Sequence, residues 1–167
     1  SRGLGDVYKR QDQTISALGQ AGNALFLDCR SLETRQMRMP ENLQIAVMDT
    51  GTRHELVDSA YNERRLQCEK AAAFFEVKAL RDLSLENLLS SEKELDPVVF
   101  RRARHVVTEN QRVLSFIKAL ESGNPEKAGQ LMNESHQSLR DDFEVSSEAL
   151  DLISECARES PGCYGAR

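Results

Sequence analysis

One stretch near the C-terminal end gathers side chains that could bind a metal ion. His136 is followed by Arg140, Asp141 and Asp142, so an imidazole and two carboxylates lie close together along the chain. Both groups are common metal ligands. The residue types alone therefore invite a metal-site interpretation, and the alternative is a structural role at the end of a packed helix.

The four cysteines give no support for a zinc site. They are scattered, with no Cys-x-x-Cys pair and no histidine at ligand spacing: Cys29, Cys68, Cys156 and Cys163. We therefore predict free, buried thiols. Such thiols suit a reducing cytosol, because a secreted chain of this size more often carries paired cysteines.

A second group of charges lies in the first half of an expected helix, at Arg101, Arg102, Arg104 and His105. The helix dipole disfavours positive charge at this end, so these side chains need partners. The partners could be carboxylates at an interface between two parts of the fold, or the face could be solvated. We favour these structural interpretations over a role in chemistry.

Three further residues suit phosphoryl or sugar chemistry, but each has an ordinary structural interpretation. Asp12 precedes the apolar residues Ile15 and Leu18, where an aspartate is typical of a helix N-cap. Tyr61 could be an aromatic residue packed at the start of a helix, and Arg53 an exposed cation in a turn. From residue types alone, the structural roles are the simpler interpretation.

The hydrophobic pattern predicts a mixed front segment. A short helix is expected over residues 12–18, and Gly19 and Gly22 end it. Three β-like runs follow, at residues 24–29, 33–39 and 44–48. Asp49-Thr50-Gly51 then forms a turn.

The remainder of the chain is predicted to be helical. Helices are expected over residues 59–75, from Asp96-Pro97 to a stop at Gly123, from Asn124-Pro125 onward, and from Ser146 or Ser147 to Pro161-Gly162. The long helix after Asp96 has an apolar seam: Val99, Ala103, Val106, Val113, Ile117 and Leu120. The pattern predicts an α+β fold, with a short helix and a small antiparallel sheet followed by four or five helices.

Charge and hydropathy exclude two classes of partner. The net charge of −5 lacks the excess of Lys and Arg that nucleic-acid binding requires, so no nucleic acid is expected. The longest apolar runs are a handful of residues, against the roughly 20 of a spanning helix, so no membrane segment is expected either.

The first eleven residues, 1–11, have neither helical nor strand periodicity. The run Asp6-Val7-Tyr8-Lys9-Arg10-Gln11 can be encoded by GAT GTG TAT AAG AGA CAG, which resembles a transposase adaptor used in sequencing libraries. We therefore interpret residues 1–11 as an adaptor-derived artefact, expect them to be disordered, and exclude them from reasoning about function.

Several ordered blocks together resemble the galactokinases of the GHMP kinase superfamily. The blocks are Asp12-Gln13 with Ile15-Ser16-Ala17-Leu18-Gly19-Gln20, Leu27-Asp28-Cys29-Arg30-Ser31-Leu32-Glu33-Thr34, Thr52-Arg53-His54 followed by Ser59-x-Tyr61-x-x-Arg64-Arg65-x-Gln67-Cys68-Glu69, Phe100-Arg101-Arg102-Ala103-Arg104-His105-Val106-Val107, and Met132-x-Glu134-Ser135-His136-x-Ser138-Leu139-Arg140-Asp141-Asp142-x-Glu144-Val145-Ser146. The resemblance implies a two-lobed GHMP-kinase fold, with residues 12–55 at the end of the N-terminal lobe and its crossover. Residues 56–167 would form part of a mainly helical C-terminal lobe.

The resemblance implies ATP-dependent phosphorylation of galactose at its C1 hydroxyl. Asp12 would be the catalytic carboxylate that orients this hydroxyl and takes its proton. Tyr61 would contact galactose, and Arg53 would lie near the nucleotide. The His136 stretch becomes a helix end beneath the cleft, so no metal site is expected in this chain.

The resemblance also indicates which segments of the family are missing from this sequence. Three family signatures are absent: the sugar-binding segment with its Arg, Glu, His and Asp, the Pro-x-Gly-x-Gly-Leu-Ser-Ser-Ser phosphate loop, and the Gly-Gly-Gly-Phe-Gly-Gly run. Both ends of the chain therefore look cut, and the fragment is expected to be inactive. ATP and galactose would be the ligands, with Mg²⁺ held by phosphates and missing residues. The complete protein is expected to be a cytoplasmic monomer.

Other functions remain open from the sequence. A related GHMP sugar kinase, acting on N-acetylgalactosamine or arabinose, would have similar helical blocks. A non-catalytic galactokinase-like regulator would differ in a phosphate loop that lies outside this sequence. A helical interaction module is the third alternative, and it would have no reason to contain the blocks around Asp12 and Tyr61.

Overall fold

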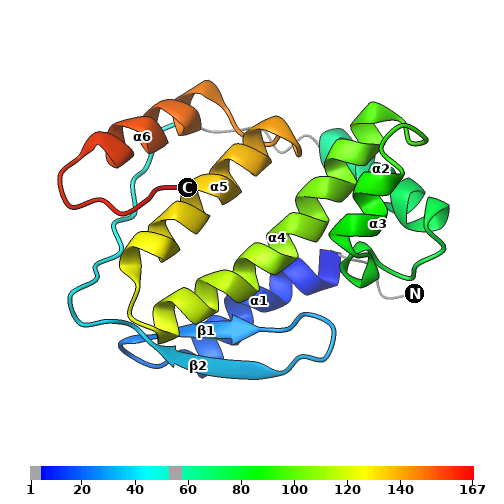
Figure 1. Cartoon of the computed structure of the whole chain (residues 1–167). Helices are drawn as coiled ribbons and strands as arrows, with labels where there is room; N and C mark the ends of the chain where they lie inside the picture. Colours follow the sequence, from blue (N-terminus) through cyan, green and yellow to red (C-terminus); the bar gives the residue numbers. More distant parts are fainter. Residues whose placement is uncertain (1–4, 53–57) are drawn as a thin grey trace.

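A computed structural model describes residues 5–52 and 58–167 of the chain. Its first part, here called the α1–hairpin unit, consists of helix α1 (Gly5–Leu18) and strands β1 (Asn23–Leu27) and β2 (Thr34–Arg38). Its second part, the helical body, consists of α2 (Asp58–Phe74), the 3-10 helix η1 (Leu80–Asp82), α3 (Leu85–Ser90), α4 (Pro97–Glu121), α5 (Pro125–Asp141) and α6 (Glu148–Glu159). Figure 1 shows the long helix α4 at the centre, α5 beside it, and the hairpin across its lower end. The predicted α+β class is confirmed, as is its order of a short helix and a small antiparallel sheet followed by helices.

The sheet is a two-stranded antiparallel hairpin, which is smaller than the sequence pattern predicted. Asn23 pairs with Arg38 at one end of the hairpin and Leu27 pairs with Thr34 at the other. The prediction of a strand over residues 44–48 is wrong, because this segment has no strand backbone and Val47 is 93% exposed. A run of β-branched residues becomes a strand only where another strand can accept its hydrogen bonds, and the described residues supply none beside it.

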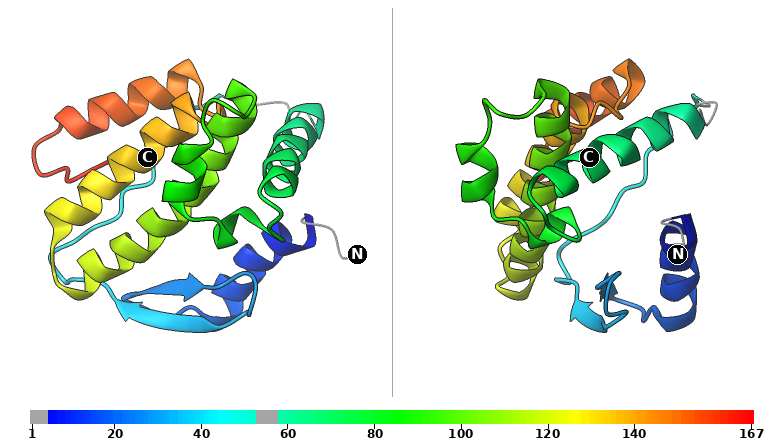
Figure 2. Two further views of the ribbon diagram at one scale, coloured as in Figure 1. Left: turned by 45° about the vertical axis from the view of Figure 1, so that its right-hand side comes forward. Right: turned by 90° about the vertical axis from the view of Figure 1, so that its right-hand side faces the viewer.

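Helix α1 is longer than predicted. It begins at Gly5, seven residues before the expected start at Asp12, so residues 5–11 have helical backbone where a disordered arm was expected. The derivation of residues 1–11 from an adaptor sequence stays a prediction. Within the described part of the chain, β1 is the one helix or strand that packs closely on α1. Figure 2 shows, in its right-hand view, that α1 stands apart from the helical body.

The boundaries of α4 and α5 confirm the sequence prediction. The Asp96 carboxylate accepts hydrogen bonds from the backbone N–H groups of Val98 and Val99 at 2.9 and 3.1 Å, which satisfies donors that have no partner within the helix. Gly123 ends the helix with a φ of +64°, a conformation that glycine adopts without strain. Asn124 then caps α5 through the N–H of Lys127 at 2.9 Å.

The core lies in the helical body and has two clusters. The larger joins α2, η1, α3 and α4: Ala71, Leu80, Leu83, Leu88, Val99, Phe100, Ala103 and Val107. The smaller joins α4 and α5, with Met39 and Leu43 packed against it: Ala119, Leu120, Ala128 and Leu131. The predicted seam of α4 is therefore mostly buried, but Val113 is 40% exposed because it faces the cavity described below.

The thiols are free, as predicted, but they are less buried than expected. Cys156 is exposed on α6, and the other three are partly buried. In the part of the chain that is described, no helix combines the length and apolar character needed to cross a bilayer.

Candidate functional site

The candidate site is a cavity of about 720 Å³ between the α1–hairpin unit and the helical body. One side of it comes from α1 and β1, including Asp12 and Ile15. The other side comes from α4 and α5, including Glu109, Val113 and Ser135. Of the described helices and strands, β1 is the one that packs closely on α1, and α1 stands apart from the helical body in the right-hand view of Figure 2.

Asp12 is the sequence-predicted catalytic residue, and the structure places it at the wall of this cavity. It lies in the middle of α1 and is solvent-exposed, so it is not the N-cap that its position before Ile15 indicated. Its backbone carbonyl accepts a hydrogen bond from the Ser16 hydroxyl at 2.7 Å. That hydrogen bond engages the backbone and not the carboxylate, and the exposed residue lines the cavity.

The wall formed by α4 and α5 carries a connected group of polar side chains. The Glu109 carboxylate accepts hydrogen bonds from the Ser135 hydroxyl at 2.6 Å and from Arg167 at 3.2 Å, and it pairs with Arg112 one turn along α4. Glu109 and Arg112 keep only 19% and 13% of their side-chain surface exposed. Sequence reasoning did not single out these two residues. Their spacing of three on one helical face was the signal that could have found them.

The turn of the hairpin supplies the end of the cavity, through Asp28, Cys29 and the facing Arg81 of η1. Arg81 donates two hydrogen bonds to Asp28, at 2.9 and 2.7 Å. This guanidinium, with the backbone N–H groups of Arg30 and Ser31, holds the pKa of the Asp28 carboxyl well below its usual range. Asp28 is therefore ionised at any physiological pH.

Tyr61 is not among the residues that line this cavity. It lies in the first turn of α2 and is 47% exposed. One turn later, Arg64 fastens α2 to the loop after α5 by donating a hydrogen bond to the Phe143 carbonyl at 2.8 Å. The described structure does not bring Asp12 and Tyr61 together at the cavity, so their shared contact with a sugar stays a prediction. Arg53 lies outside the described residues.

The arginines at the start of α4 have structural partners, as predicted. Arg102 is 3% exposed and donates hydrogen bonds to the Gln67 side chain at 3.0 Å, to the Asp142 carbonyl and to the Glu144 carboxylate. Arg101 pairs with the same carboxylate at 3.0 Å, and Arg104 pairs with Asp142. The charged partners are carboxylates of the loop that follows α5, and Gln67 belongs to α2, so the cluster joins three segments of the helical body.

His136 is held by a carboxylate from α6. Its Nε2 lies 2.9 Å from Asp151, which also accepts a hydrogen bond from Ser146 at 2.7 Å. These contacts connect α5 to the first turn of α6. Within residues 5–52 and 58–167, no group of three or more His, Cys, Asp or Glu is arranged to hold a metal ion.

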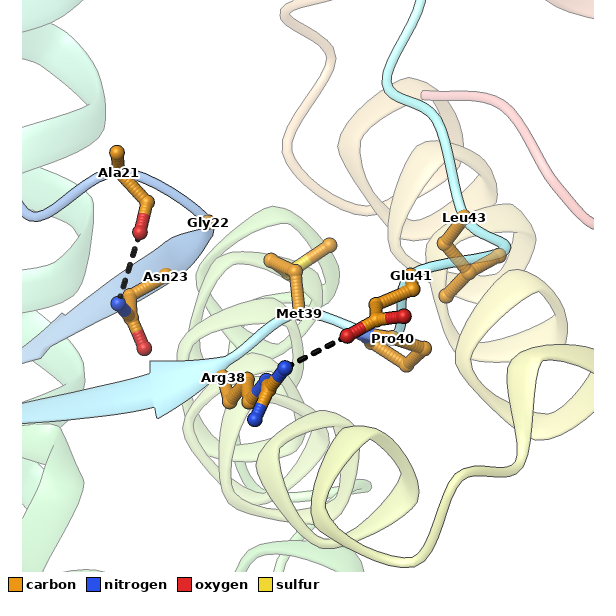
Figure 3. A pocket seen from close by; sticks show the side chains of 8 residues that line it. All are labelled: Ala21, Gly22, Asn23, Arg38, Met39, Pro40, Glu41 and Leu43. Carbon is orange, nitrogen blue, oxygen red and sulfur yellow. Dashed lines mark hydrogen bonds and ion pairs between the residues drawn. The ribbon is translucent and has the colours of Figure 1, made fainter.

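A second hollow lies at the open end of the hairpin and is shown in Figure 3. Its two charged side chains, Arg38 and Glu41, pair with each other at 2.6 Å, and both are largely exposed. The Asn23 amide donates to the Ala21 carbonyl at 3.1 Å. The polar groups of this hollow are exposed to solvent and already have hydrogen-bond partners within it. We therefore regard the cavity beside Asp12 as the candidate site.

The cavity suits a small polar molecule that has one apolar face. Leu25, Phe26 and Val113 provide apolar surface, while Asp12 and the polar α4–α5 wall provide groups that bond to hydroxyls. Asp12 is an exposed carboxylate, and it could accept a proton or a hydrogen bond from such a hydroxyl.

Comparisons with known proteins were made for the sequence and for the fold. The chain is 52% identical over 157 residues to a galactokinase of Pasteurella multocida, a match that covers 92% of this chain and 41% of that protein. The fold matches the crystal structure of Lactococcus lactis galactokinase complexed with galactose, with a TM-score of 0.83 and 34% identity, over 89% of this chain and 40% of that one. The chain thus spans about two fifths of each relative's length. A comparison with protein-family models finds no match.

Proposed function

Because this chain belongs to the galactokinase family and spans about two fifths of the length of its relatives, we propose that the complete protein transfers the γ-phosphoryl group of ATP to galactose. The transfer would be to the C1 hydroxyl and would give galactose 1-phosphate. The observation that carries the proposal is the position of Asp12, in a matching sequence block, at the wall of a cavity of suitable size. This chain alone would be inactive, because the phosphate loop and the sugar-binding segment lie outside it.

The proposed role of Asp12 is to orient the C1 hydroxyl and to take its proton. As the proton passes to the carboxylate, the sugar oxygen forms a bond to the γ-phosphorus and the bond to the β–γ bridging oxygen breaks. ADP leaves with the electron pair. A carboxylate is a sufficient base, because an anomeric hydroxyl is more acidic than an ordinary alcohol.

Tyr61 is proposed to contact galactose, because a phenol offers an apolar face and a hydroxyl to a sugar. Its place in the first turn of α2, which Arg64 fastens to the loop after α5, supports a fixed position for the ring. Arg53 is proposed to lie near the nucleotide, where a guanidinium would stabilise charge on the phosphoryl oxygens. Both roles require parts of the protein beyond this chain.

Mg²⁺ is proposed to arrive with the phosphates of ATP. The described residues offer no cluster that fits this ion, so we assign none of them to it. The protein is further proposed to work as a cytoplasmic monomer, in agreement with its four free thiols.

The proposal can be tested with a chimera. The matched 157-residue segment of the Pasteurella multocida galactokinase would be replaced by the corresponding segment of this chain. The chimera should form galactose 1-phosphate and ADP from galactose and ATP. Asp12→Asn should lower kcat by about a hundredfold or more, since a positioned base contributes roughly that factor.

Matched controls separate catalysis from folding. Asp141→Asn changes an exposed carboxylate at the end of α5, outside the cavity, and should leave kcat unchanged. Retained turnover in Asp12→Asn would remove Asp12 from its role. A folded chimera that binds galactose and ATP without turnover would point to a regulator, and turnover of N-acetylgalactosamine alone would point to a related kinase.

A further inference from the structure

The turn of the hairpin and η1 are joined by two ion pairs, here called the crossed ion pairs because each segment supplies one arginine and one aspartate. Arg81 of η1 donates to Asp28 of the turn, and Arg30 of the turn donates to Asp82 of η1. Each pair is bidentate, with all four N–O distances between 2.7 and 2.9 Å. A planar guanidinium and a planar carboxylate that meet in this way fix direction as well as distance.

The order of the charges allows one alignment of the two segments. The turn presents an aspartate and then an arginine, while η1 presents an arginine and then an aspartate. A displacement along η1 that brought Asp28 towards Asp82 would carry Arg30 past Asp82, and the opposite displacement would bring Arg30 towards Arg81. Like charges at contact distance repel, so either shifted arrangement loses both attractions and gains one repulsion.

Both sides of this contact are themselves held in place. On the helical body, Leu80 and Leu83 flank the two charged residues of η1 and are only 5% and 7% exposed, within the larger core cluster. On the hairpin, the Asp28 carboxylate also accepts the backbone N–H groups of Arg30 at 2.7 Å and Ser31 at 3.1 Å. The ion pairs therefore connect two segments whose local conformations are fixed.

Few other contacts attach the described part of the α1–hairpin unit to the helical body, although Met39 and Leu43, which follow β2, pack against the smaller core cluster. Met37 of β2 is the one buried hydrophobic side chain of the hairpin in the described chain, and β2 packs against α4. Arg35 and Glu121 form a single, exposed ion pair at 3.4 Å. Because α1 packs on β1, the position of Asp12 follows that of the hairpin.

Contacts between α1 and the hairpin transmit that position. At the C-terminal end of α1, the Gln36 amide of β2 donates to the Leu18 carbonyl at 2.6 Å. This end of α1 is thus fastened to the hairpin.

We propose that the crossed ion pairs, Asp28 with Arg81 and Arg30 with Asp82, position the α1–hairpin unit, and with it the Asp12 carboxylate, against the helical body. These four are positioning residues that act through α1. The proposal rests on the proposed function, in which Asp12 must meet a sugar bound by both parts of the protein. Misplacement of a reacting group by about 1 Å can cost a hundredfold in rate.

The test uses the ion pair between Arg30 and Asp82, because neither of these residues lines the cavity. In the chimera, Arg30→Asp places two carboxylates opposite each other, and Asp82→Arg places two guanidinium groups opposite each other. Each single variant should lower kcat about tenfold. The double variant R30D/D82R restores opposite charges and should recover most of the loss. Arg38→Asp, which breaks the exposed pair with Glu41, is the matched control and should leave kcat unchanged.

Two further measurements distinguish positioning from loss of folded protein. The melting temperature should change little in all variants, because exposed ion pairs contribute little to stability. Hydrogen exchange should become faster in α1 and the hairpin of the single variants and return to normal in the double variant. If kcat falls only in proportion to the folded fraction, or if R30D/D82R recovers neither kcat nor exchange protection, the proposal is wrong.

The same experiment separates this proposal from the proposed function. If the unsubstituted chimera folds but does not phosphorylate galactose, the proposed function fails. The crossed pairs are then judged by exchange alone: restored protection in the double variant supports their positioning of α1, and unchanged exchange in every variant overturns it.

Discussion

The two parts of this molecule are held together by different forces. In the helical body, apolar side chains from four helices form the larger core cluster, and even the charged residue Arg102 is buried. Among the residues of the α1–hairpin unit whose burial is described, Met37 is the one buried hydrophobic side chain, and ion pairs and a side-chain amide make other contacts at its edges. In the right-hand view of Figure 2, α1 stands apart from the helices of the body.

This difference matters for function because the two parts contribute different things. The helical body is a scaffold whose shape is set by packing, and packing is short-ranged and hard to deform. The α1–hairpin unit carries Asp12, and its position depends on a few directional contacts. We expect substitutions in the body to change global stability, and substitutions at the hairpin to change local opening and the geometry of the cavity.

The largest effect is expected for Leu88→Ala in the helical body. Leu88 is fully buried, so the substitution removes its packing and leaves a cavity, at a cost of about 2–5 kcal/mol of unfolding free energy. The matched control is Leu89→Ala on the same helix, where the side chain is 48% exposed and the expected change is below about 0.5 kcal/mol. Denaturant unfolding of both variants measures the difference. Equal losses would contradict the proposed position of the core.

A smaller and more local effect is expected for Met37→Ala in β2. The expected loss of unfolding free energy is about 2 kcal/mol. This is the low end of the range for a core methionine, because the Met37 side chain borders the open cavity. Its loss should loosen the hairpin and α1 while the core of the body stays protected. Hydrogen exchange resolved by segment measures this, with the half-exposed Met48→Ala as control. Uniformly faster exchange across α4 and α5 would show that the two parts unfold together.

The sequence was sufficient wherever a structural feature depends on neighbouring residues. The start of α4 follows from Asp96 and Pro97, and its end follows from Gly123, because capping and left-handed φ values are local properties. The resemblance of the five ordered sequence blocks to galactokinases also identified the family, which the comparisons confirm.

The sequence was insufficient wherever a partner lies far along the chain. The run around Val47 has the composition of a strand, but composition cannot say whether a second strand is beside it. The sequence predicted that Arg102 needs a carboxylate partner. It could not predict that this partner is Glu144, which lies 42 residues away along the chain. The crossed ion pairs are of the same kind, since Asp28 and Arg81 are 53 residues apart.

Acid should weaken the helical body through His105. Burial lowers the pKa of this imidazole below its ordinary value of 6.5, and its ring stacks on Phe143 with centroids 4.6 Å apart. The unfolded chain therefore binds a proton more readily than the folded one, so this contribution to stability is lost as the pH falls from 7 through 6.5. Denaturant midpoints at pH 7 and 5.5 should differ slightly. In His105→Gln this difference between the two midpoints should shrink. An unchanged difference would show that His105 is not its cause.

The last prediction concerns the alkylation rates of thiols in the two parts of the molecule. Burial raises the pKa of the Cys68 thiol in α2 to about 11, so at pH 8 roughly one molecule in a thousand carries the reactive thiolate. Alkylation of Cys68 should therefore be about a hundredfold slower than that of an ordinary exposed thiol. Cys29, in the hairpin turn, should react sooner, because opening of the hairpin is enough to expose it. Mass spectrometry of the alkylated chain gives the order, with Cys156 as the exposed reference. If Cys68 reacted before Cys29, the hairpin would be the more tightly closed of the two parts, and the comparison would be reversed.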